Sequence, residues 1–471
     1  MKPDEVPEPE PEPATPVELT KSGSRLKVRV VTTSDGLRWS PKRIDQWFDS
    51  QRQTYCTWQK AGPDGAFYCV GTGLDKIPNA EPGYYVDANC TEGIAYVTPS
   101  GNPDAILVKR GIACGELPRY FAPGATITST PYHRDIAGRC TQQAFSSNTA
   151  HNYRLPGVEM PPGAFVRGTS RPRLPGSGIE VHFIEGEDGS EAFQHVTDTV
   201  HGTECSVRLA GDLKPRCLPS GDQTALGVHR NWSDSACTQP AFKAACAPAR
   251  FGLTHAVDAC RDTVSAYSVK EEIGVVYSSG ISGTCEGHYT SSTYNPPYFS
   301  GETELPAETW PEAKPVDMAT YGRLTVRGME FGGSARIPTG LFDNQLGVDC
   351  EFMSDTFETR HCFPVTPFFV ANAFSDSRCT QALAPHNGAP ICGEHRYAIY
   401  YAPPPFGGPV YYSLHPLGPK HVGPVYSIRR LHMQGSSPFC IQMMHPEHPA
   451  YWTIGEAIPT SMMVEGTPGL D

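Results

Sequence analysis

Three stretches of the chain alternate apolar and polar residues, and they begin roughly 150 residues apart. They are Leu26-Lys-Val-Arg-Val, Ile179-Glu-Val-His-Phe and Leu324-Thr-Val-Arg-Gly. A period of two residues predicts a β-strand with one buried face. A turn signal follows each stretch, at Asp35-Gly36, Asp188-Gly189 and Gly332-Gly333. Each stretch is therefore expected to open a β-hairpin.

A motif of aspartates and cysteines follows each predicted hairpin and defines a threefold repeat. In the first copy, Asp49 precedes Cys56 and Cys69, and an Asp-x-x-Cys-Thr sequence begins at Asp87. The equivalent residues are Asp198, Cys205, Cys217, Asp234 and Cys237 in the second copy and Asp343, Cys350, Cys362, Asp376 and Cys379 in the third. The separation is 149 residues from Cys56 to Cys205 and 145 residues from Cys205 to Cys350. We expect a disordered Pro/Glu-rich tether at 1–24 and repeats at 25–170, 171–318 and 319–471.

The rest of the sequence also favours strands. Gly and Pro each number 46 among 471 residues, and no stretch keeps an apolar period of 3.6 residues with helix caps. An all-β fold with about eight strands per repeat is predicted, which corresponds to two propeller blades or one sandwich. The chain is then either one six-bladed β-propeller or three tandem β-sandwich domains. Two observations favour the propeller. The linkers between repeats are short, so the repeats should pack tightly together, and a closed ring leaves few exposed sheet edges.

Two groups of acidic residues are interpreted as turn residues rather than metal ligands. Asp49, Asp198 and Asp343 each follow an apolar residue, where an aspartate side chain commonly accepts hydrogen bonds from backbone amides. We therefore expect them to cap turns. The second hairpin alone carries an acidic cluster, formed by Glu185, Glu187, Asp188 and Glu191. We interpret this cluster as a solvated turn and not as a calcium site.

The chain has 16 cysteines without the CxxC pairs that bind zinc or perform redox chemistry. This content predicts disulfides formed in an oxidising compartment. Four positions recur in every repeat and are predicted to pair as Cys56–Cys69, Cys90–Cys140, Cys205–Cys217, Cys237–Cys285, Cys350–Cys362 and Cys379–Cys440. Cys246 and Cys260 are expected to pair within repeat 2. Cys114 and Cys392 either clasp the ends of a closed ring or give way to a local alternative, Cys114–Cys140 and Cys379–Cys392.

Cysteine content and the N-terminal sequence together predict export. Met1 leads directly into the Pro/Glu tract, so we expect a mature protein whose signal peptide was removed and a start methionine added. If Met1 replaces a lipidated cysteine, the native precursor carries a lipid anchor. The net charge of −12 argues against nucleic acid or an anionic membrane as partner, and no run of 18 apolar residues predicts a transmembrane segment. The expected location is extracellular or on the outer cell surface.

The sequence also resembles a known group of proteins. The residues that carry the likeness are Arg25-Leu-Lys-Val-Arg29, Trp47-Phe-Asp-Ser50, Arg216-Cys-Leu-Pro219 and Asp234-Ser-Ala-Cys-Thr-Gln-Pro240. They resemble the cysteine-rich repeats of secreted proteins and lipoproteins of predatory myxobacteria, over nearly the whole chain after residue 24. The resemblance implies export and surface exposure, and it brings no catalytic residues.

The third repeat departs from the symmetry in two ways. It holds eight of the 16 histidines, and His445-Pro-Glu-His448 is a candidate site for zinc or copper. No other cofactor is expected. An aromatic, proline-rich segment contains the candidate ligand-binding residues Tyr400, Tyr401, Phe406, Tyr411 and Tyr412. Rigid aromatic surfaces bind sugars, peptides or proteins at low entropic cost, although an apolar plug between blades explains the same residues.

Three functional hypotheses follow from these observations. The first is a disulfide-stapled binding or adhesion protein that recognises an extracellular protein or glycan. The second is a secreted hydrolase or metal-dependent oxidase that uses the histidines of repeat 3. The third is a structural subunit that self-associates in an envelope or fibre. The sequence lacks the nucleophile elbow, zinc-protease motif and phosphate loop of common enzymes, so we assign no catalytic residue and lean against an enzyme.

Overall fold

The computed structural model describes most of the chain after residue 17. The described residues are 18–40, 47–60, 65–71, 74–76, 83–96, 106–109, 118–135, 138–142, 153–173, 178–244, 249–258, 261–279, 284–289, 297–332, 335–354, 359–370, 372–386, 395–402, 411–429, 439–443 and 450–471.

These residues fold into β-structure throughout. They contain 39 β-strands, three short 3-10 helices and no α-helix, so the all-β prediction is confirmed. The described helices include none with the length and apolar character needed to cross a membrane. The strands outnumber the eight per repeat expected from the sequence, because the second half of each repeat is divided into short strands such as β9 (Ala95–Tyr96) and β32 (Phe369–Val370).

The first half of each repeat is an antiparallel meander that uses the alternating stretches identified in the sequence. In repeat 1 it consists of β2 (Leu26–Thr32), β3 (Arg38–Trp39), β4 (Trp47–Asp49), β5 (Thr54–Lys60) and β6 (Phe67–Gly71). In repeat 2 it consists of β16 (Ile179–Gly186), β17 (Glu191–Asp198), β18 (Thr203–Leu209) and β19 (Pro215–Pro219). In repeat 3 it consists of β28 (Leu324–Phe331), β29 (Ala335–Asp343), β30 (Val348–Ser354) and β31 (Arg360–Pro364). The apolar residues of the alternation are buried, as predicted for a strand with one inner face.

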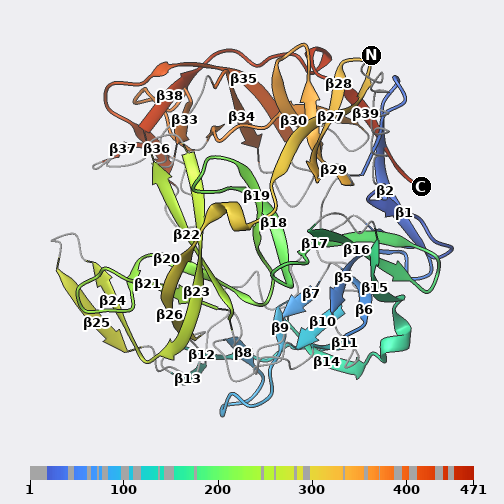
Figure 1. Cartoon of the computed structure of the whole chain (residues 1–471), viewed down its shortest axis with the longest axis vertical. Coiled ribbons are helices and arrows are strands. Elements are labelled where there is room, and N and C mark those ends of the chain that lie inside the picture. The colour runs from blue at the N-terminus through green and yellow to red at the C-terminus, as the bar shows by residue number, and fades with distance from the viewer. Residues whose placement is uncertain are drawn as a thin grey trace, which may run out of the picture.

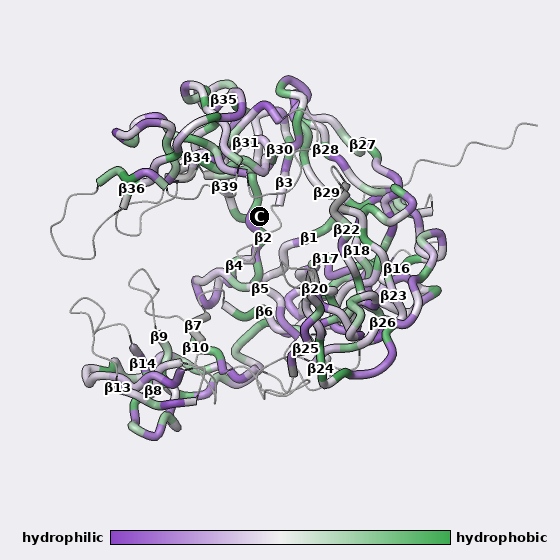
Figure 2. Tube along the Cα trace, turned by 90° about the vertical axis from the view of Figure 1, so that its left-hand side faces the viewer, coloured by the Kyte–Doolittle hydropathy of each residue, from purple (hydrophilic) through white to green (hydrophobic). Residues whose placement is uncertain are grey.

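The second half of each repeat forms separate sheets, which we call the outer sheets. Repeat 1 contributes β7 (Leu74–Lys76), β8 (Gly83–Tyr85), β9, β10 (Ile106–Lys109), β11 (Arg119–Thr126), β12 (Tyr132–Arg134), β13 (Cys140–Gln142) and β14 (Tyr153–Glu159). Repeat 2 contributes β20 (Thr224–Trp232), β21 (Pro240–Lys243), β22 (Phe251–Asp258), β23 (Arg261–Ile273), β24 (Val275–Ser279), β25 (Cys285–Tyr289) and β26 (Tyr298–Leu305). Repeat 3 contributes β32, β33 (Leu383–His386), β34 (Tyr397–Ala402), β35 (Tyr411–Lys420), β36 (Tyr426–Arg429), β37 (Phe439–Gln442) and β38 (Ala450–Ile454). Figure 2 shows the outer sheets of repeats 1 and 3 projecting to one side, whereas β23 and β26 of repeat 2 lie on the other.

A return strand leads from each outer sheet back to the meander. The return strands are β15 (Arg167–Arg173), β27 (Ala313–Tyr321) and β39 (Glu465–Leu470), and each follows a 3-10 helix, at Pro162–Ala164, Ala307–Thr309 and Thr460–Met462. The second cysteine of each meander hairpin donates its amide to the chain just before or at the start of this strand. These bonds run from Cys69, Cys217 and Cys362 to the carbonyls of Val166, Pro311 and Val464, at 3.0, 2.9 and 2.9 Å.

The return strands join the three repeats into a closed circuit of paired strands. β15 pairs with β6 of its own repeat and β16 of the next, and β27 pairs with β28 and reaches β19 through a bridge between Arg216 and Glu312. β39 pairs with β31 and with β2, so the last strand of the chain lies beside the strand that opens repeat 1 (Figure 1). The predicted repeat boundaries at 170/171 and 318/319 fall inside β15 and β27. The first strand, β1 (Thr20–Lys21), belongs to the predicted tether but pairs with β17.

The described sheets are not arranged as six sets of four strands. They contain 17, 5, 3, 7, 5 and 2 strands, and the largest includes strands of all three repeats. The structure therefore has large sheets with a threefold internal repeat and does not show a closed propeller.

The cores lie at the junctions between repeats. One cluster combines Leu26, Val28 and Trp47 of repeat 1 with Ile184 and Ala192 of repeat 2. A second combines Ile179, Val181 and Val196 of repeat 2 with Phe331 and Ile337 of repeat 3. A third combines Leu324, Leu341 and Phe352 of repeat 3 with Val31 and Leu37 of repeat 1. Because each repeat buries its meander against the next, no repeat has a complete core of its own in this part of the fold.

Six disulfides staple the described chain, two in each repeat. They are Cys56–Cys69, Cys90–Cys140, Cys205–Cys217, Cys237–Cys285, Cys350–Cys362 and Cys379–Cys440, the same pairs that the recurring positions predict. The local alternative, Cys114–Cys140 and Cys379–Cys392, is wrong, because Cys140 and Cys379 are bonded to Cys90 and Cys440. Cys114, Cys246, Cys260 and Cys392 lie outside the described residues, so the clasp between Cys114 and Cys392 and the pair Cys246–Cys260 stay predictions.

Candidate functional site

The aspartate that ends the second long strand of each meander has a structural role. Asp49, Asp198 and Asp343 are fully buried, and each accepts two backbone amides from the following turn at 2.9 to 3.2 Å. The guanidinium of Arg25 donates to both oxygens of Asp49 at 2.8 and 2.7 Å, and Arg323 does the same for Asp343 at 2.6 Å. All three aspartates therefore cap turns, as the sequence predicts, and Asp49 and Asp343 also neutralise a partly buried arginine.

Repeat 2 replaces this arginine with a histidine. Gly178 precedes its first strand, and Nδ1 of His201 lies 2.6 Å from Oδ2 of Asp198 instead. The His201 ring packs on Trp310 with 4.1 Å between centroids. A buried aspartate that orients a histidine also occurs in hydrolases. In this fold the equivalent carboxylates, Asp49 and Asp343, hold arginines. We therefore interpret His201 as a structural replacement for the arginine. The sequence pattern did not indicate this role of His201.

The Asp-x-x-Cys-Thr motif is a disulfide-bearing turn. Its aspartate, Asp87, Asp234 or Asp376, accepts the hydroxyl of the motif threonine at 2.6 to 3.0 Å. It also accepts the amide of Glu92, Gln239 or Gln381 at 2.7 to 2.9 Å, and this bond is the main reason that the aspartate pKa lies below its usual value. The cysteines have positive φ angles of 52 to 54°, which the turn and the disulfide hold in place. The motif thus serves folding in all three copies.

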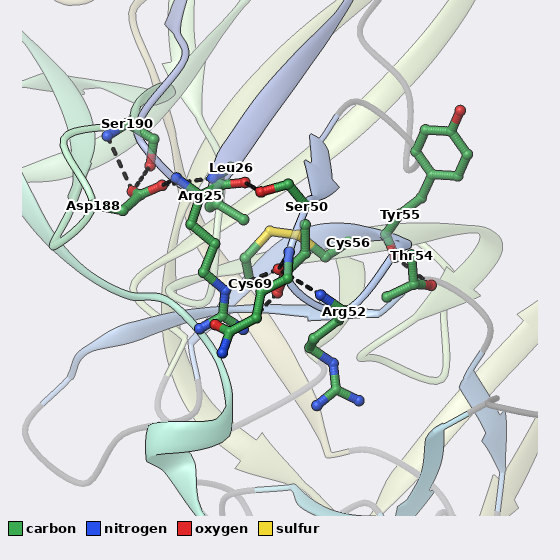
Figure 3. Close-up of a disulfide and its surroundings, with 12 residues drawn as sticks. Arg25, Leu26, Ser50, Arg52, Thr54, Tyr55, Cys56, Cys69, Asp188 and Ser190 are labelled. Carbon is green, nitrogen blue, oxygen red and sulfur yellow. Dashed lines mark hydrogen bonds and ion pairs between the residues drawn. A yellow bond between two sulfur atoms is a disulfide. The ribbon is translucent and has the colours of Figure 1, made fainter.

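The acidic turn of repeat 2 is a contact between repeats. Asp188 accepts the amides of Arg25 and Leu26 of repeat 1 at 3.1 and 2.6 Å, and the amide and hydroxyl of Ser190 in its own turn (Figure 3). Burial alone would raise the pKa of Asp188, but these hydrogen bonds outweigh it and the pKa lies below its usual value. The prediction of a solvated turn is wrong for this residue, because the sequence does not reveal which strand the turn approaches.

Among the predicted aromatic residues of repeat 3, the two with described side chains, Tyr400 and Tyr412, lie in different surroundings. Tyr400 is exposed and its ring lies 6.3 Å from that of His415, whereas Tyr412 is half-buried and packs against Phe363 of the core. Tyr401 and Tyr411 lie on β34 and β35, which pair with each other, and Phe406 lies outside the described residues. Ligand binding by this segment stays a prediction.

The candidate metal ligands His445 and His448 also lie outside the described residues. Within the described chain, no group of three or more histidine, cysteine or carboxylate side chains is arranged to hold a metal ion. Metal binding by these two histidines stays a prediction.

A cavity of about 350 Å³ lies between repeats 1 and 3, and we call it the junction cavity. Its lining comes from the segment before β2, from β2 and β3, and from β27 to β29: Glu18, Leu19, Thr20, Val30, Leu37, Arg38, Trp39, Ser40, Met318, Ala319, Tyr321, Val326 and Pro338. Val30, Leu37 and Val326 are buried, while Trp39 and Tyr321 are partly exposed. An apolar interior with a few polar groups at its edge is typical of ligand sites of this size.

The residues of one cross-strand pair of the meander differ between the repeats, and the copies in repeats 1 and 3 contribute Val30 and Pro338 to the lining of this cavity. In repeat 2, Phe183 and Phe193 face each other across β16 and β17 with 6.0 Å between ring centroids. Repeat 3 has Gly328 opposite Pro338 at the equivalent pair. Phe183 and Gly328 each lie four residues after the first residue of their meander, so the two pairs are equivalent.

Repeat 1 has a valine where repeat 2 has Phe183. Val30 lies four residues after the start of its meander, as Phe183 does, and Ser40 follows Trp39, the residue opposite Val31. Val30, Ser40 and Pro338 all line the junction cavity. The lining of this cavity thus lacks the two phenyl rings that repeat 2 has at its own copy of the pair.

The charged groups at the junction cavity are not balanced. Arg38 forms an ion pair with the carboxylate of Asp471. The carboxylate of Glu18, in contrast, has no ion-pair or hydrogen-bond partner among the described residues. Among the described residues, the mouth of the cavity therefore carries two carboxylates and one guanidinium.

A second hollow of about 550 Å³ crosses β27 to β30 and is more polar. Its arginine, Arg327, lies 2.9 Å from Asp349 and 3.6 Å from Asp317, and it stacks on Phe342 at 3.5 Å. A cation over an aromatic ring recurs at the same position of repeat 1, where Arg29 stacks on Tyr55. All three of these charged side chains take part in ion pairs, whereas Glu18 of the junction cavity has no described partner.

Two overlapping stretches of the chain, residues 8–296 and 177–459, match the model of a family of unknown function, DUF7481. The chain belongs to this family. Each match covers about two repeats, and the second match begins near the start of repeat 2, as a threefold repeat requires. No curated protein and no solved structure matches the chain.

Proposed function

We propose that this DUF7481 protein is a non-enzymatic extracellular binding protein that holds an apolar group of its ligand in the junction cavity. The cavity is the observation that carries the proposal, since it combines a buried apolar floor with aromatic walls and an incompletely paired mouth. The apolar group is part of an extracellular protein or glycan, or of an extracellular small molecule.

Two further observations support this function. Six disulfides stabilise the described chain, and such bonds persist in oxidising compartments outside the cytoplasm. The carboxylates that recur in every repeat are engaged by backbone amides, arginine or histidine, and this leaves no threefold set of free acids for catalysis among the described residues. Attachment to the outer cell surface through a lipid anchor, implied by the resemblance to myxobacterial lipoproteins, is part of the same proposal.

The test is saturable binding of a small neutral ring compound, 2-phenylethanol, measured by ligand-observed nuclear magnetic resonance. Ser40→Phe places a phenyl ring in the cavity, and it should abolish binding. Ala319→Phe, from the opposite wall, should do the same if Ser40→Phe fails to fold. Thr339→Phe, in the second hollow, is the matched control and should bind normally. Binding that survives both cavity-filling variants would refute the proposal.

A further inference from the structure

We infer that the group taken up by the junction cavity is an aromatic ring that carries a basic nitrogen. This inference rests on the proposed function and adds the chemical class of the ligand. It draws on the shape of the lining, on the charges at the mouth and on the net charge of the protein.

The lining favours a flat ring. Trp39 and Tyr321 contribute aromatic side chains from repeats 1 and 3, and Met318 contributes a polarisable thioether, a group that packs well against ring edges. Repeat 2 places two phenyl rings, those of Phe183 and Phe193, at a pair whose described equivalents in the cavity lining have none. A ligand ring would thus supply the kind of group that repeat 2 supplies from its own chain.

The charges favour a cation. Arg38 is already paired with Asp471, so Glu18 is the charged group of the lining that has no described partner. An ammonium group near Glu18 would form an ion pair at the mouth and would also lie close to aromatic faces, which attract cations. The net charge of −12 adds a long-range attraction for basic ligands and a repulsion for acidic ones.

The experiment compares three probes that share a phenyl ring and differ in charge: 2-phenylethylamine, 2-phenylethanol and phenylacetate. Their dissociation constants are measured by calorimetry at low ionic strength. We expect the amine to bind about three- to fivefold more tightly than the alcohol, the gain typical of a partly exposed ion pair, and phenylacetate to bind most weakly.

Variants assign the charge effect to one residue. Glu18→Gln should bring amine and alcohol within about twofold of each other and leave the alcohol unchanged, because only the ion pair is removed. Glu456→Gln is the control, since it removes the same charge from an exposed position in repeat 3. This control should keep the preference for the amine.

The outcomes separate the ligand class from the function. If the alcohol binds in the cavity as well as the amine does, or if phenylacetate binds most tightly, the inferred class is wrong and the binding function stands. A preference for the amine that persists in Glu18→Gln would equally overturn the inference. If none of the three probes binds, the proposed function itself fails.

Discussion

Acidification should destabilise repeat 2 through two stacked histidines. His182 of β16 and His195 of β17 are directly opposite each other, with ring centroids 4.5 Å apart and an angle of 17° between the rings. Burial, with a smaller contribution from the charge of His182, lowers the pKa of His195 from 6.5 to about 4. The His195 ring is therefore neutral near pH 7. His182 occupies the strand position that has Arg29 in repeat 1 and Arg327 in repeat 3.

Carboxylates nearby oppose this effect but do not cancel it. Glu180 lies 3.5 Å from His182, and Glu204 lies 3.6 Å from His195. Burial raises the pKa of Glu204, with a smaller contribution from Asp222, so this carboxylate offers less negative charge to the histidine as the pH falls. We give more weight to burial because the side chain of His195 is only 18% exposed.

The sign and size follow from proton linkage. The unfolded chain binds a proton at His195 near pH 6.5, whereas the folded protein resists it down to about pH 4. The contribution to stability is therefore present above pH 6.5 and is lost as the pH falls towards 4. A shift of this size corresponds to about 3 kcal/mol of unfolding free energy in full.

The assay is urea unfolding at pH values between 7.5 and 4.5 for the wild type and for His195→Phe. The variant keeps an aromatic ring without the titration, so the wild type should lose about 2 to 3 kcal/mol more than the variant over this range. His288→Phe replaces an exposed histidine on β25 and should follow the wild type. Parallel stability curves for the wild type and His195→Phe would refute the reasoning.

Three further perturbations test the contacts that hold the fold. Asp343→Ala leaves Arg323 without its partner and should lower the free energy of unfolding in urea by about 3 kcal/mol. Asp349→Ala breaks an exposed pair and should lower it by less than about 1 kcal/mol. Equal losses would contradict the structural role of Asp343. Replacing Cys237 and Cys285 by serine opens a longer loop than replacing Cys205 and Cys217, with sequence separations of 48 and 12. The expected losses are about 4 and about 3 kcal/mol, and the reverse order would count against the chain-entropy account. Deleting residues 465–471 removes β39 and should lower the melting temperature of the whole chain measured by calorimetry; an unchanged melting profile would show that closure between β31 and β2 contributes little.

Much of the inner architecture was predictable because it depends on local and periodic features. Alternation placed β2, β16 and β28, and the recurring spacing of Cys56, Cys205 and Cys350 gave the repeat and the disulfide partners. The outer sheets were not predictable in the same way, since they include distant pairings such as the parallel contact of β20 with β22. Periodicity reveals that a strand has an inner face but does not identify the strand beside it.

The junction cavity escaped the sequence analysis for a related reason. Its lining combines Glu18, Trp39 and Tyr321, which are far apart in the chain and meet only because the return strands close the circuit. The signal that was available is the contrast of Phe183 in repeat 2 with Val30 in repeat 1 and Gly328 in repeat 3, but these positions can be compared only with the register of the strands. The role of Asp188 was hidden in the same way, because its partners Arg25 and Leu26 belong to another repeat.

The most direct test of the binding site is a crystal structure of the protein with 2-(4-bromophenyl)ethylamine, in which the bromine is located by its anomalous signal. We predict a bromine peak inside the junction cavity, between the side chains of Trp39 and Tyr321, with the amine directed towards Glu18. Bromine found only at other places on the protein, or none at a saturating concentration of the amine, would contradict the account.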